Sequence, residues 1–348
     1  GHSSSTSQGP ATSSTPVPSV ATSSTRAASA TSQAARDLPD PHTLRGLTEV
    51  PELPDPKPVE GSSAQKLPVT VTDVEGNKVT IKSTSRILAL DLYGTLSRTL
   101  IGLGLGDKIV GRTVSSTEKQ LHDRPVVTEN GHVLNVEAVA GLKPSVIIAD
   151  RSVGPKEALD QLRKSGIPVV LVDPHRSVDS TPQLIRTIAD AVGKPDAGEA
   201  LVKRTQEQID QAKKQIAAWK PAKPMRVAFL YVRGNAGVFF ILGSENGASE
   251  LIQGVGADDV ASDKGITTLV PANAESLVSI NPDAIFVMRD GLASTGGMKG
   301  LLARAGVANT TAGRKQRVIS IPDGISLSFG PQTGEVLTAV AKALYGVK

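Results

Sequence analysis

The sequence predicts an α/β protein of two lobes with mainly parallel sheets, joined by one long helix and preceded by a disordered tail. Three observations support this fold class. Short continuous apolar runs alternate with helical patterns, which is typical of strands buried on both faces of a parallel sheet. The alternation stops once, at an amphipathic helix, and then resumes. At 348 residues the chain is long enough for two domains of ordinary size.

Residues 1–66 are expected to form the tail and a linker. Residues 1–35 are nearly all Ser, Thr, Ala, Gln and Pro, which offer too little apolar surface to offset the entropy of ordering. Closely spaced prolines continue this stretch as an extended linker to about Lys66. Such a leader suits a domain held on a stalk above a membrane, and a cytosolic protein with a floppy tail fits it too. The start at Gly1-His2-Ser3 resembles an expression scar, so we expect a native leader to have been removed.

The N-terminal lobe is expected over residues 67–195. It opens with a hairpin, because residues 69–71 and 79–81 alternate apolar and polar side chains around a turn at 75–77. Buried strands and intervening helices follow. The strands are expected at residues 86–90, 108–111, 146–149 and 169–172, and the helices at 93–103, 134–141 and 156–165.

A connecting helix is expected over residues 196–220. Leu201 and Ile209 lie on an apolar stripe of helical spacing opposite charged residues, and Pro221 ends the pattern. The C-terminal lobe then covers residues 221–348. Its strands are expected at 226–232, 238–242, 284–288 and 317–321, and its helices at 246–253, 273–280, 298–305 and 330–345. Both lobes are thus Rossmann-like, and ligands should collect beyond the carboxyl ends of their strands, in a cleft between the lobes.

The composition disfavours several classes of function. The chain has no cysteine, which excludes disulfides, thiolate metal sites and cysteine nucleophiles. Its net charge of +4 is small and its aromatic content of 3% is low, so nucleic-acid binding is disfavoured. The common phosphate-loop, dinucleotide, serine-hydrolase and zinc-protease motifs do not occur. An enzyme is therefore disfavoured, although a pair of acid and base carboxylates stays open.

Tyr231 and His132 are the candidate ligand-binding residues. Tyr231 is one of three tyrosines and ends an expected strand, and Arg233 should point to the same side of the extended chain. A guanidinium beside a phenol favours the phenolate, a hard ligand that suits ferric iron. His132 follows the turn Glu129-Asn130-Gly131, which should present its imidazole outward. A tyrosine that caps the core and a solvated or capping histidine are the alternative interpretations.

Several phrases resemble the proteins that bind metal chelates and haem for ABC importers, the class III substrate-binding proteins. Two of these phrases read GLGDKIVG and NVEAVAGLKP. The matching phrases lie at residues 86–90, 103–113, 135–148, 248–257 and 271–285, and the likeness runs from about Val69 to the C-terminus. Within the class, the chain is similar to the HmuT-type haem-binding lipoproteins of corynebacteria, which also have a long Ser/Thr-rich leader.

This resemblance implies that haem is captured between the lobes and that the chain catalyses nothing. His132 and Tyr231 would be the axial ligands of ferric haem and thus its metal contacts, Arg233 would hydrogen-bond the tyrosine, and Met288 would lie beside the haem. The implied partners are ABC permease and ATPase subunits and other cell-surface haem-binding proteins. A lipid anchor on a cysteine outside the sequence would hold the protein to the outer face of the cell membrane.

The resemblance also implies a role for two acidic residues in docking to the permease. Glu137 and Glu250 occupy matching phrases of the two lobes and should project from helices. An ordinary carboxylate on a helix surface is the alternative. Basic residues near the rim of the cleft are candidates for the haem propionates, and the sequence does not choose among Arg151, Lys264, Arg289 and Lys299.

Three other functions remain as alternatives. A carrier of ferric siderophore or cobalamin would supply aromatic walls and arginines, yet the sequence has few aromatics and the His132/Tyr231 pair would have no use. A bare-metal carrier would need three or four converging ligands. A bilobal α/β enzyme is the alternative from a different class, and it would not purify with the red-brown colour of haem.

Overall fold

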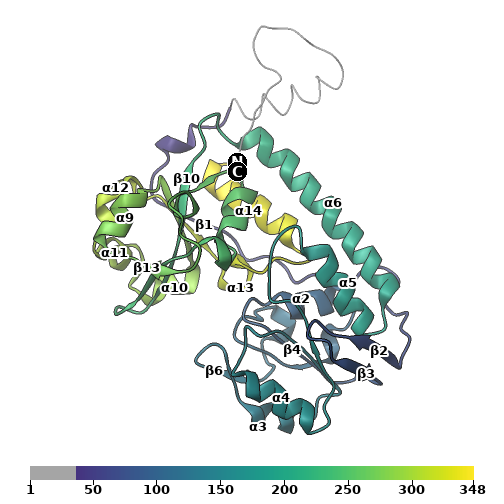
Figure 1. The fold of residues 1–348 in the computed structure, drawn as a ribbon. Helices are drawn as coiled ribbons and strands as arrows, with labels where there is room; N and C mark the ends of the chain where they lie inside the picture. Colours follow the sequence, from purple (N-terminus) through teal and green to yellow (C-terminus); the bar gives the residue numbers. More distant parts are fainter. Residues whose placement is uncertain (1–36) are drawn as a thin grey trace, which may run out of the picture. The chain divides into compact units, whose positions relative to one another are not determined.

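The computed structural model describes residues 37–348, so the disorder expected for residues 1–35 lies outside the described part (Figure 1). Within this part the chain forms two compact units. The N-terminal unit comprises residues 53–208 and 328–334. The C-terminal unit comprises residues 209–327 and 335–348 together with the described residues up to Glu52. Because residues 328–334 belong to the N-terminal unit, the long helix is one of several connections between the units.

The central sheet of the N-terminal unit is parallel, as expected. Its strands lie in the order β5 (Ile109–Gly111), β4 (Ile87–Leu90), β8 (Val146–Ala149) and β9 (Val169–Leu171). Every residue of β4, β8 and β9 is buried, which explains why these strands read as continuous apolar runs. All of their carboxyl ends reach the same edge of the sheet.

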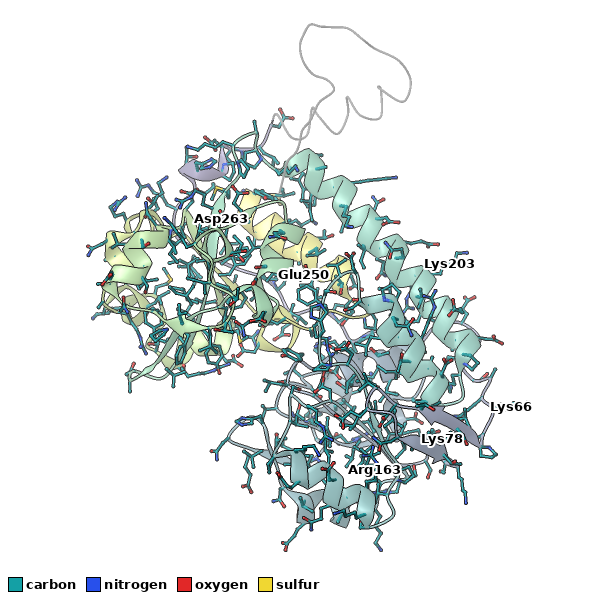
Figure 2. All side chains as sticks on the ribbon, in the orientation of Figure 1. Lys66, Lys78, Arg163, Lys203, Glu250 and Asp263 are labelled. Atoms are coloured by element: carbon teal, nitrogen blue, oxygen red, sulfur yellow. The ribbon has the colours of Figure 1, made fainter. Side chains whose placement is uncertain are left out.

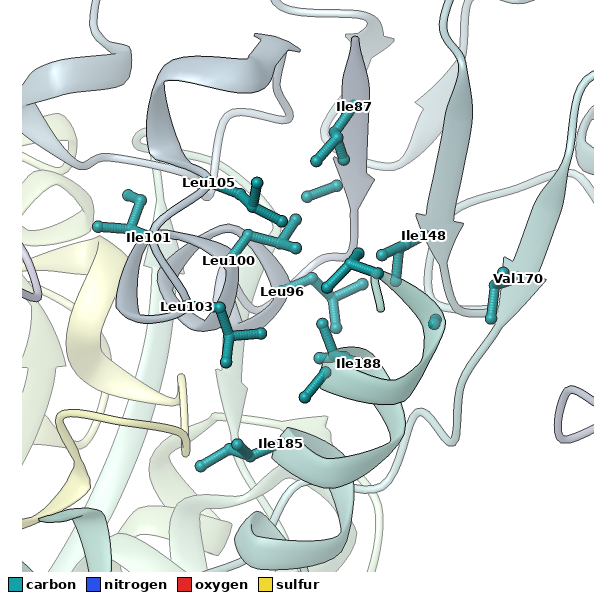
Figure 3. Packing of buried hydrophobic residues seen from close by; sticks show 14 of the residues in the cluster. Ile87, Leu96, Leu100, Ile101, Leu103, Leu105, Ile148, Val170, Ile185 and Ile188 are labelled. Carbon is teal, nitrogen blue, oxygen red and sulfur yellow. The ribbon is translucent and has the colours of Figure 1, made fainter. Parts of the chain in front are cut away.

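Helices cover both faces of this sheet (Figure 1). Ile87 and Ala89 of β4 pack with α2 (Thr95–Gly102) and α5 (Thr181–Ala191), and Figure 3 shows this core. Leu88 and Leu90 point the other way and pack with α3 (Val136–Gly141) and α4 (Lys156–Lys164). Alternate residues of one strand therefore build two separate cores, as the period of a strand requires.

Two hairpins flank the sheet of the N-terminal unit. The hairpin of β2 (Val69–Thr72) and β3 (Lys78–Ile81) turns where the sequence predicts it. The second hairpin, of β6 (Thr128–Glu129) and β7 (Val133–Leu134), was not expected from the sequence and carries His132 in its turn.

A single unbroken helix, α6 (Pro195–Trp219), confirms the connecting helix (Figure 1). Its 25 residues correspond to roughly 37 Å at the rise of an α-helix. Leu201, Ile209 and Ile216 are buried, as the apolar stripe predicts. The boundary between the two units falls within the helix, after Gln208. None of the helices between residues 37 and 348 combines the length and the apolar character of a membrane span.

The sheet of the C-terminal unit is mixed. Its strands follow the order β1 (Leu47–Glu49), β15 (Val318–Ile321), β14 (Ala284–Met288), β10 (Arg226–Arg233), β11 (Val238–Ile241) and β13 (Val270–Pro271), and β12 (Asp258–Asp259) also pairs with β10. The pairs among β1, β15, β14, β10 and β12 are parallel. The pairs of β11 with β10 and β13 are antiparallel, so β10 and β11 form a hairpin.

Short helices pack against this sheet. A core on one face joins β10, β14 and β15 to apolar residues of the helices from 260 to 312. On the opposite face, the rings of Phe229 and Phe286 meet edge to face with centroids 6.4 Å apart. The helices of the unit are α7 (Ala248–Gly254), α8 (Val260–Asp263), α9 (Ala274–Ile280), α10 (Arg289–Ser294), α11 (Gly297–Leu302), α12 (Thr311–Lys315), α13 (Asp323–Ser326) and α14 (Thr333–Tyr345).

The sequence predicted an extended linker up to Lys66, and this prediction is wrong for the described part of that stretch, which packs against the folded units. Leu47 to Glu49 form β1, which pairs in parallel with β15 at the edge of the sheet. Arg317 donates a hydrogen bond of 2.8 Å to Oγ1 of Thr48, and Val50 is 2% exposed. The flanking prolines suit this position, since an edge strand leaves one side of its backbone unpaired.

Candidate functional site

The candidate site in the C-terminal unit lies where three parallel strands end. Since β10, β14 and β15 pair in parallel, the residues at their carboxyl ends share one edge of the sheet. Tyr231 and Arg233 lie near the end of β10, Met288 is the last residue of β14, and Asp323 follows β15 after one proline. The structure therefore brings together three residues that the sequence singled out, with Asp323 as an additional member.

Tyr231 and Arg233 lie on the same side of β10. Both are half-buried, whereas Val232 between them is buried on the other side. The guanidinium carbon of Arg233 lies 5.5 Å from the centroid of the Tyr231 ring, a cation–π contact. The strand extends two residues beyond Tyr231, because β11 pairs with β10 as far as Arg233. Tyr231 thus lies beyond the last residue that pairs with β14, Phe229.

Asp323 anchors Arg233. Nη2 of Arg233 donates to Oδ2 of Asp323 at 2.6 Å and lies 3.7 Å from the sulfur of Met288. Burial lowers the pKa of Arg233, but hydrogen bonds to Asp323 and Tyr231 outweigh this and leave the pKa raised. Sequence reasoning missed Asp323. Its signal was present, as an acidic residue that follows a buried strand after one proline, and the carboxyl end of that strand reaches the same edge.

Gly291 allows α10 to approach this edge closely. A Cβ atom on Gly291 would lie 2.6 Å from the carbonyl oxygen of Val232 and 3.6 Å from Nη1 of Arg233. Any side chain here would push α10 away from β10, while its distance from the guanidinium would be that of an ordinary van der Waals contact. The small residue therefore helps to fix the surroundings of Arg233.

His132 is exposed on the N-terminal unit, in the turn between β6 and β7. Asn130 and Gly131 before it have φ values of 52° and 86°, a left-handed backbone that these two residue types adopt readily. The carbonyl oxygen of His132 accepts a hydrogen bond from the backbone amide of Gly154 at 2.8 Å. The backbone is held while the imidazole faces solvent, as the sequence predicts.

The edge of the N-terminal sheet near His132 presents apolar side chains. Leu92 follows β4 and is 40% exposed, and Val114 follows β5 and is 50% exposed. The hydroxyl of Ser152 accepts from the backbone amide of Leu92 at 2.8 Å, and Ser152 belongs to the same loop as Gly154. The turn of His132 and this apolar edge are therefore connected through one loop.

A buried cluster of charges lies beneath this loop. Nη2 of Arg176 donates to Asp91 at 3.0 Å and to Asp150 at 2.6 Å, and all three side chains are almost fully buried. Burial and the like charge of Asp91 raise the pKa of Asp150 to about 6. The backbone amide and the hydroxyl of Ser152 both donate to Asp150. Sequence reasoning missed this cluster, because its members are far apart in the chain.

Glu137 and Glu250 both lie in the first turn of a helix. Glu137 is exposed on α3. Glu250, which Figure 2 labels, is half-buried on α7. A carboxylate in this position also interacts favourably with the helix dipole. Of the basic residues considered for the haem propionates, Arg151 pairs with Glu75 at 2.7 Å and Arg289 pairs with Glu52 at 2.5 Å. These two side chains therefore already have carboxylate partners.

The chain matches the Periplasmic binding protein family over residues 92–324. The match spans about two thirds of the sequence, and the chain belongs to this family. Members serve ABC transporters as substrate-binding proteins, so the chain is a binding protein and not an enzyme.

Three proteins of known or described binding function are similar to this chain over most of its length. The solved structure of the haem-binding protein HmuT is 49% identical, covers 89% of this chain and 100% of its own, and superposes with a TM-score of 0.87. The ABC transporter substrate-binding lipoprotein YvrC of Bacillus subtilis is 27% identical over 80% of this chain and 86% of its own. The cobalamin-binding protein of Halobacterium salinarum is 25% identical over 84% of this chain and 78% of its own.

Further HmuT structures are of variants with one residue replaced by alanine, namely a histidine, a tyrosine or an arginine. The intervals between these residues along the HmuT chain equal those that separate His132, Tyr231 and Arg233 here.

Proposed function

We propose that this chain is the extracytoplasmic substrate-binding protein of an ABC importer and that its cargo is haem. The observation that carries the proposal is the group of Tyr231, Arg233 and Asp323 at one sheet edge, with a tyrosine placed beside a fixed guanidinium. The identity of 49% with haem-binding HmuT and the matching intervals of His132, Tyr231 and Arg233 support it.

In this proposal each unit contributes one axial ligand to the haem iron. His132 offers an exposed imidazole from the N-terminal unit, and Tyr231 offers a phenol from the C-terminal unit. Imidazole and phenolate together complete the coordination of six-coordinate ferric haem. In the complex, the guanidinium of Arg233, whose carbon lies 5.5 Å from the centroid of the Tyr231 ring, would place a positive charge beside the phenolate ligand. The thioether of Met288, close to Arg233, would contact the haem ring.

Apolar side chains near both ligands suit the faces of a porphyrin. Leu92 and Val114 are exposed at the carboxyl edge of the N-terminal sheet, and Val238, opposite Arg233 on β11, is 40% exposed. Burying such side chains against an apolar ring supplies affinity, while the two ligands supply specificity.

Delivery completes the proposed cycle. A permease with its ATPase subunits would receive the haem, and Glu137 and Glu250 would dock the loaded protein onto the permease. Other haem-binding proteins of the cell surface would supply haem. A lipid anchor ahead of the tail would hold the protein at the outer face of the cell membrane.

Cobalamin is the second candidate cargo, favoured by the cobalamin-binding relative from Halobacterium salinarum, and a ferric siderophore is the alternative to it. A siderophore fills the coordination sphere of its iron, so it leaves no use for His132 and Tyr231 as metal ligands. Haem leaves both axial positions open and uses them.

Titration of the purified protein with ferric haem, followed by absorption spectroscopy, tests the proposal. We expect a one-to-one complex with a six-coordinate spectrum, changed in different ways by His132→Ala and Tyr231→Ala. His122→Ala is the matched control, because His122 is also an exposed loop histidine of the N-terminal unit. If haem binds saturably and neither variant changes the complex, haem remains the cargo, but His132 and Tyr231 are not its ligands. An absence of saturable binding would remove haem and make siderophores and cobalamin the next cargoes to test.

A further inference from the structure

We propose that Asn130 is a site of spontaneous covalent modification, at which the backbone amide of Gly131 attacks the side-chain amide and converts the asparagine to aspartate and isoaspartate. The site lies in the turn between β6 and β7, two residues before His132. The isoaspartate form loosens this hairpin. The inference goes beyond the proposed function, because neither the reaction nor its test involves haem.

The reaction needs only water in addition to the two residues. The nitrogen of Gly131 forms a bond to Cγ of Asn130, the bond between Cγ and the side-chain nitrogen breaks, and ammonia leaves with the proton of the Gly131 amide. The product is a succinimide ring. Water then opens the ring at either of its two carbonyl groups. One opening gives aspartate, and the other gives isoaspartate, in which the main chain runs through Cγ.

Both reacting groups are accessible in the turn. Asn130 is exposed, and no described residue hydrogen-bonds its side-chain amide. Among the described residues, none accepts a hydrogen bond from the backbone amide of Gly131. Glycine has no side chain to hinder the attacking nitrogen, and a Cβ atom built on Gly131 would meet nothing within 4 Å. The nitrogen and Cγ can therefore approach each other without breaking a contact.

The hairpin explains why this reactive pair of residues stands here. Asn130 and Gly131 have φ values of 52° and 86°, and Asn-Gly is the preferred pair where both central residues of a hairpin turn need a positive φ. The backbone conformation thus favours the pair, and its exposure makes the pair reactive.

A second copy of the same tripeptide provides an internal comparison. Residues 245–247 repeat the sequence Glu-Asn-Gly of residues 129–131, and the chain contains no other Asn-Gly pair. Asn246 is half-buried, and its Oδ1 accepts from the backbone amide of Gly243 at 3.0 Å. Gly247 is the N-cap of α7. The side chain of Asn246 has to give up its hydrogen bond before its Cγ can turn toward Gly247, whereas Asn130 has no such bond to break.

The first arm of the test follows both sites by peptide mapping. The purified protein is incubated in mildly alkaline buffer, and mass spectrometry measures the modified fraction at each asparagine over time. We expect Asn130 to convert about tenfold faster than Asn246, the factor that corresponds to breaking one hydrogen bond. In the same buffer with urea, which unfolds the chain, the two rates should become similar, because the tripeptides are identical.

Other results would overturn the proposal. Equal rates in the folded protein would mean that the sequence alone sets the reactivity, and faster conversion at Asn246 would mean that the hydrogen bond to Gly243 does not protect it. Conversion of Asn130 in urea only would mean that the folded turn prevents the attack. Asn130→Gln should abolish the product at this position and leave the rate at Asn246 unchanged, since the longer side chain does not form the succinimide.

The second arm examines the hairpin itself. Isoaspartate at position 130 adds one carbon atom to the main chain of a turn whose neighbours are held by two hydrogen bonds. The amide of Gly154 donates to the carbonyl oxygen of His132 at 2.8 Å, and the amide of Leu134 donates to that of Gly154 at 2.7 Å. We expect both amides to exchange hydrogen faster in the isoaspartate form, separated by ion-exchange chromatography, than in the unmodified protein.

Asn130→Asp is the matched control for this arm, because it adds the same negative charge and keeps the normal main chain. Its amides at Gly154 and Leu134 should exchange as in the original protein. Unchanged exchange in the isoaspartate form, or equally fast exchange in Asn130→Asp, would overturn the effect of the lengthened main chain on the hairpin.

Discussion

The backbone amide of Gly154 donates to the carbonyl oxygen of His132 at 2.8 Å, and this bond joins the proposed haem ligand to the loop after β8. The amide of Leu134 returns a bond of 2.7 Å to the carbonyl oxygen of Gly154. The same loop contains Ser152, whose amide and hydroxyl donate to the buried Asp150. The position of an exposed histidine is therefore linked to a buried cluster of charges.

Replacing Arg176 by Met should destabilise the N-terminal unit strongly. The substitution leaves Asp91 and Asp150 buried without their shared cation, and breaking a buried pair in this way costs about 3–5 kcal/mol. Urea unfolding measures the change. Arg186→Met is the control, because Arg186 and its partner Glu199 are both exposed, and little effect is expected. Equal losses in the two variants would contradict the structural role of the cluster.

The stability of the protein should respond to the protonation of Asp150. Its pKa in the folded state is about 6, raised by burial and by Asp91 from an ordinary value of 3.8. Between these pH values the folded protein holds a proton that the unfolded chain has released, so this group makes stability fall as pH rises through the window. In Asp150→Asn this contribution is absent. The free energy of unfolding of the variant minus that of the original protein should therefore rise between pH 4 and pH 6.

Urea titrations at a series of pH values and constant ionic strength provide this comparison. Asp123→Asn is the control for the loss of one carboxylate, since Asp123 is an exposed carboxylate of the same unit. If the difference in the free energy of unfolding between Asp150→Asn and the original protein does not change between pH 4 and pH 6, the carboxyl of Asp150 does not titrate in this window.

Gly291→Ala should disturb the candidate site by changing how α10 packs against β10. The added methyl group would lie 2.6 Å from the carbonyl oxygen of Val232, so α10 has to shift away from β10, at a cost of about 1–3 kcal/mol. Haem affinity should fall as Arg233 loses its close surroundings. Gly237→Ala, at a position with open space in the same unit, should leave both quantities nearly unchanged. Calorimetric melting and haem titration report the two effects, and identical behaviour of the variants would remove the packing argument.

Local sequence patterns predicted most of the helices and strands, but few of the contacts between segments that are distant in the sequence. The strand expected at 284–288 is β14, and the helix expected at 196–220 is α6 within one residue at each end. These elements carry their own signal, as an apolar run and a helical stripe. The strand β1 was missed, because its three residues have a partner about 270 positions later and the nearby prolines indicate a linker.

The candidate site shows the same division. Tyr231 and Arg233 are two residues apart, so the period of a strand alone predicts that their side chains lie together. Asp323 is 90 positions from Arg233, and only the parallel order of β10, β14 and β15 brings it to the same edge. The sequence did not predict the cluster of Asp91, Asp150 and Arg176 either. A buried charged residue is recognised by the residues that pair with it, and these three residues meet only in the folded chain.

Reversing either proposed docking charge should separate haem uptake from haem binding. Glu137→Lys and Glu250→Lys change residues in the first turns of α3 and α7, and neither residue is one of the proposed iron ligands. If these carboxylates meet cationic side chains of a permease, each reversal replaces attraction by repulsion, and uptake of haem into cells should fall at least tenfold, equivalent to about 1.4 kcal/mol. The spectrum and affinity of the haem complex should stay unchanged.

Glu157→Lys and Glu275→Lys are matched controls, since both residues are exposed in the first turn of another helix. Loss of uptake in the controls as well would show that a lysine near any helix start is harmful in itself, and normal uptake in all variants would remove both residues from the docking surface.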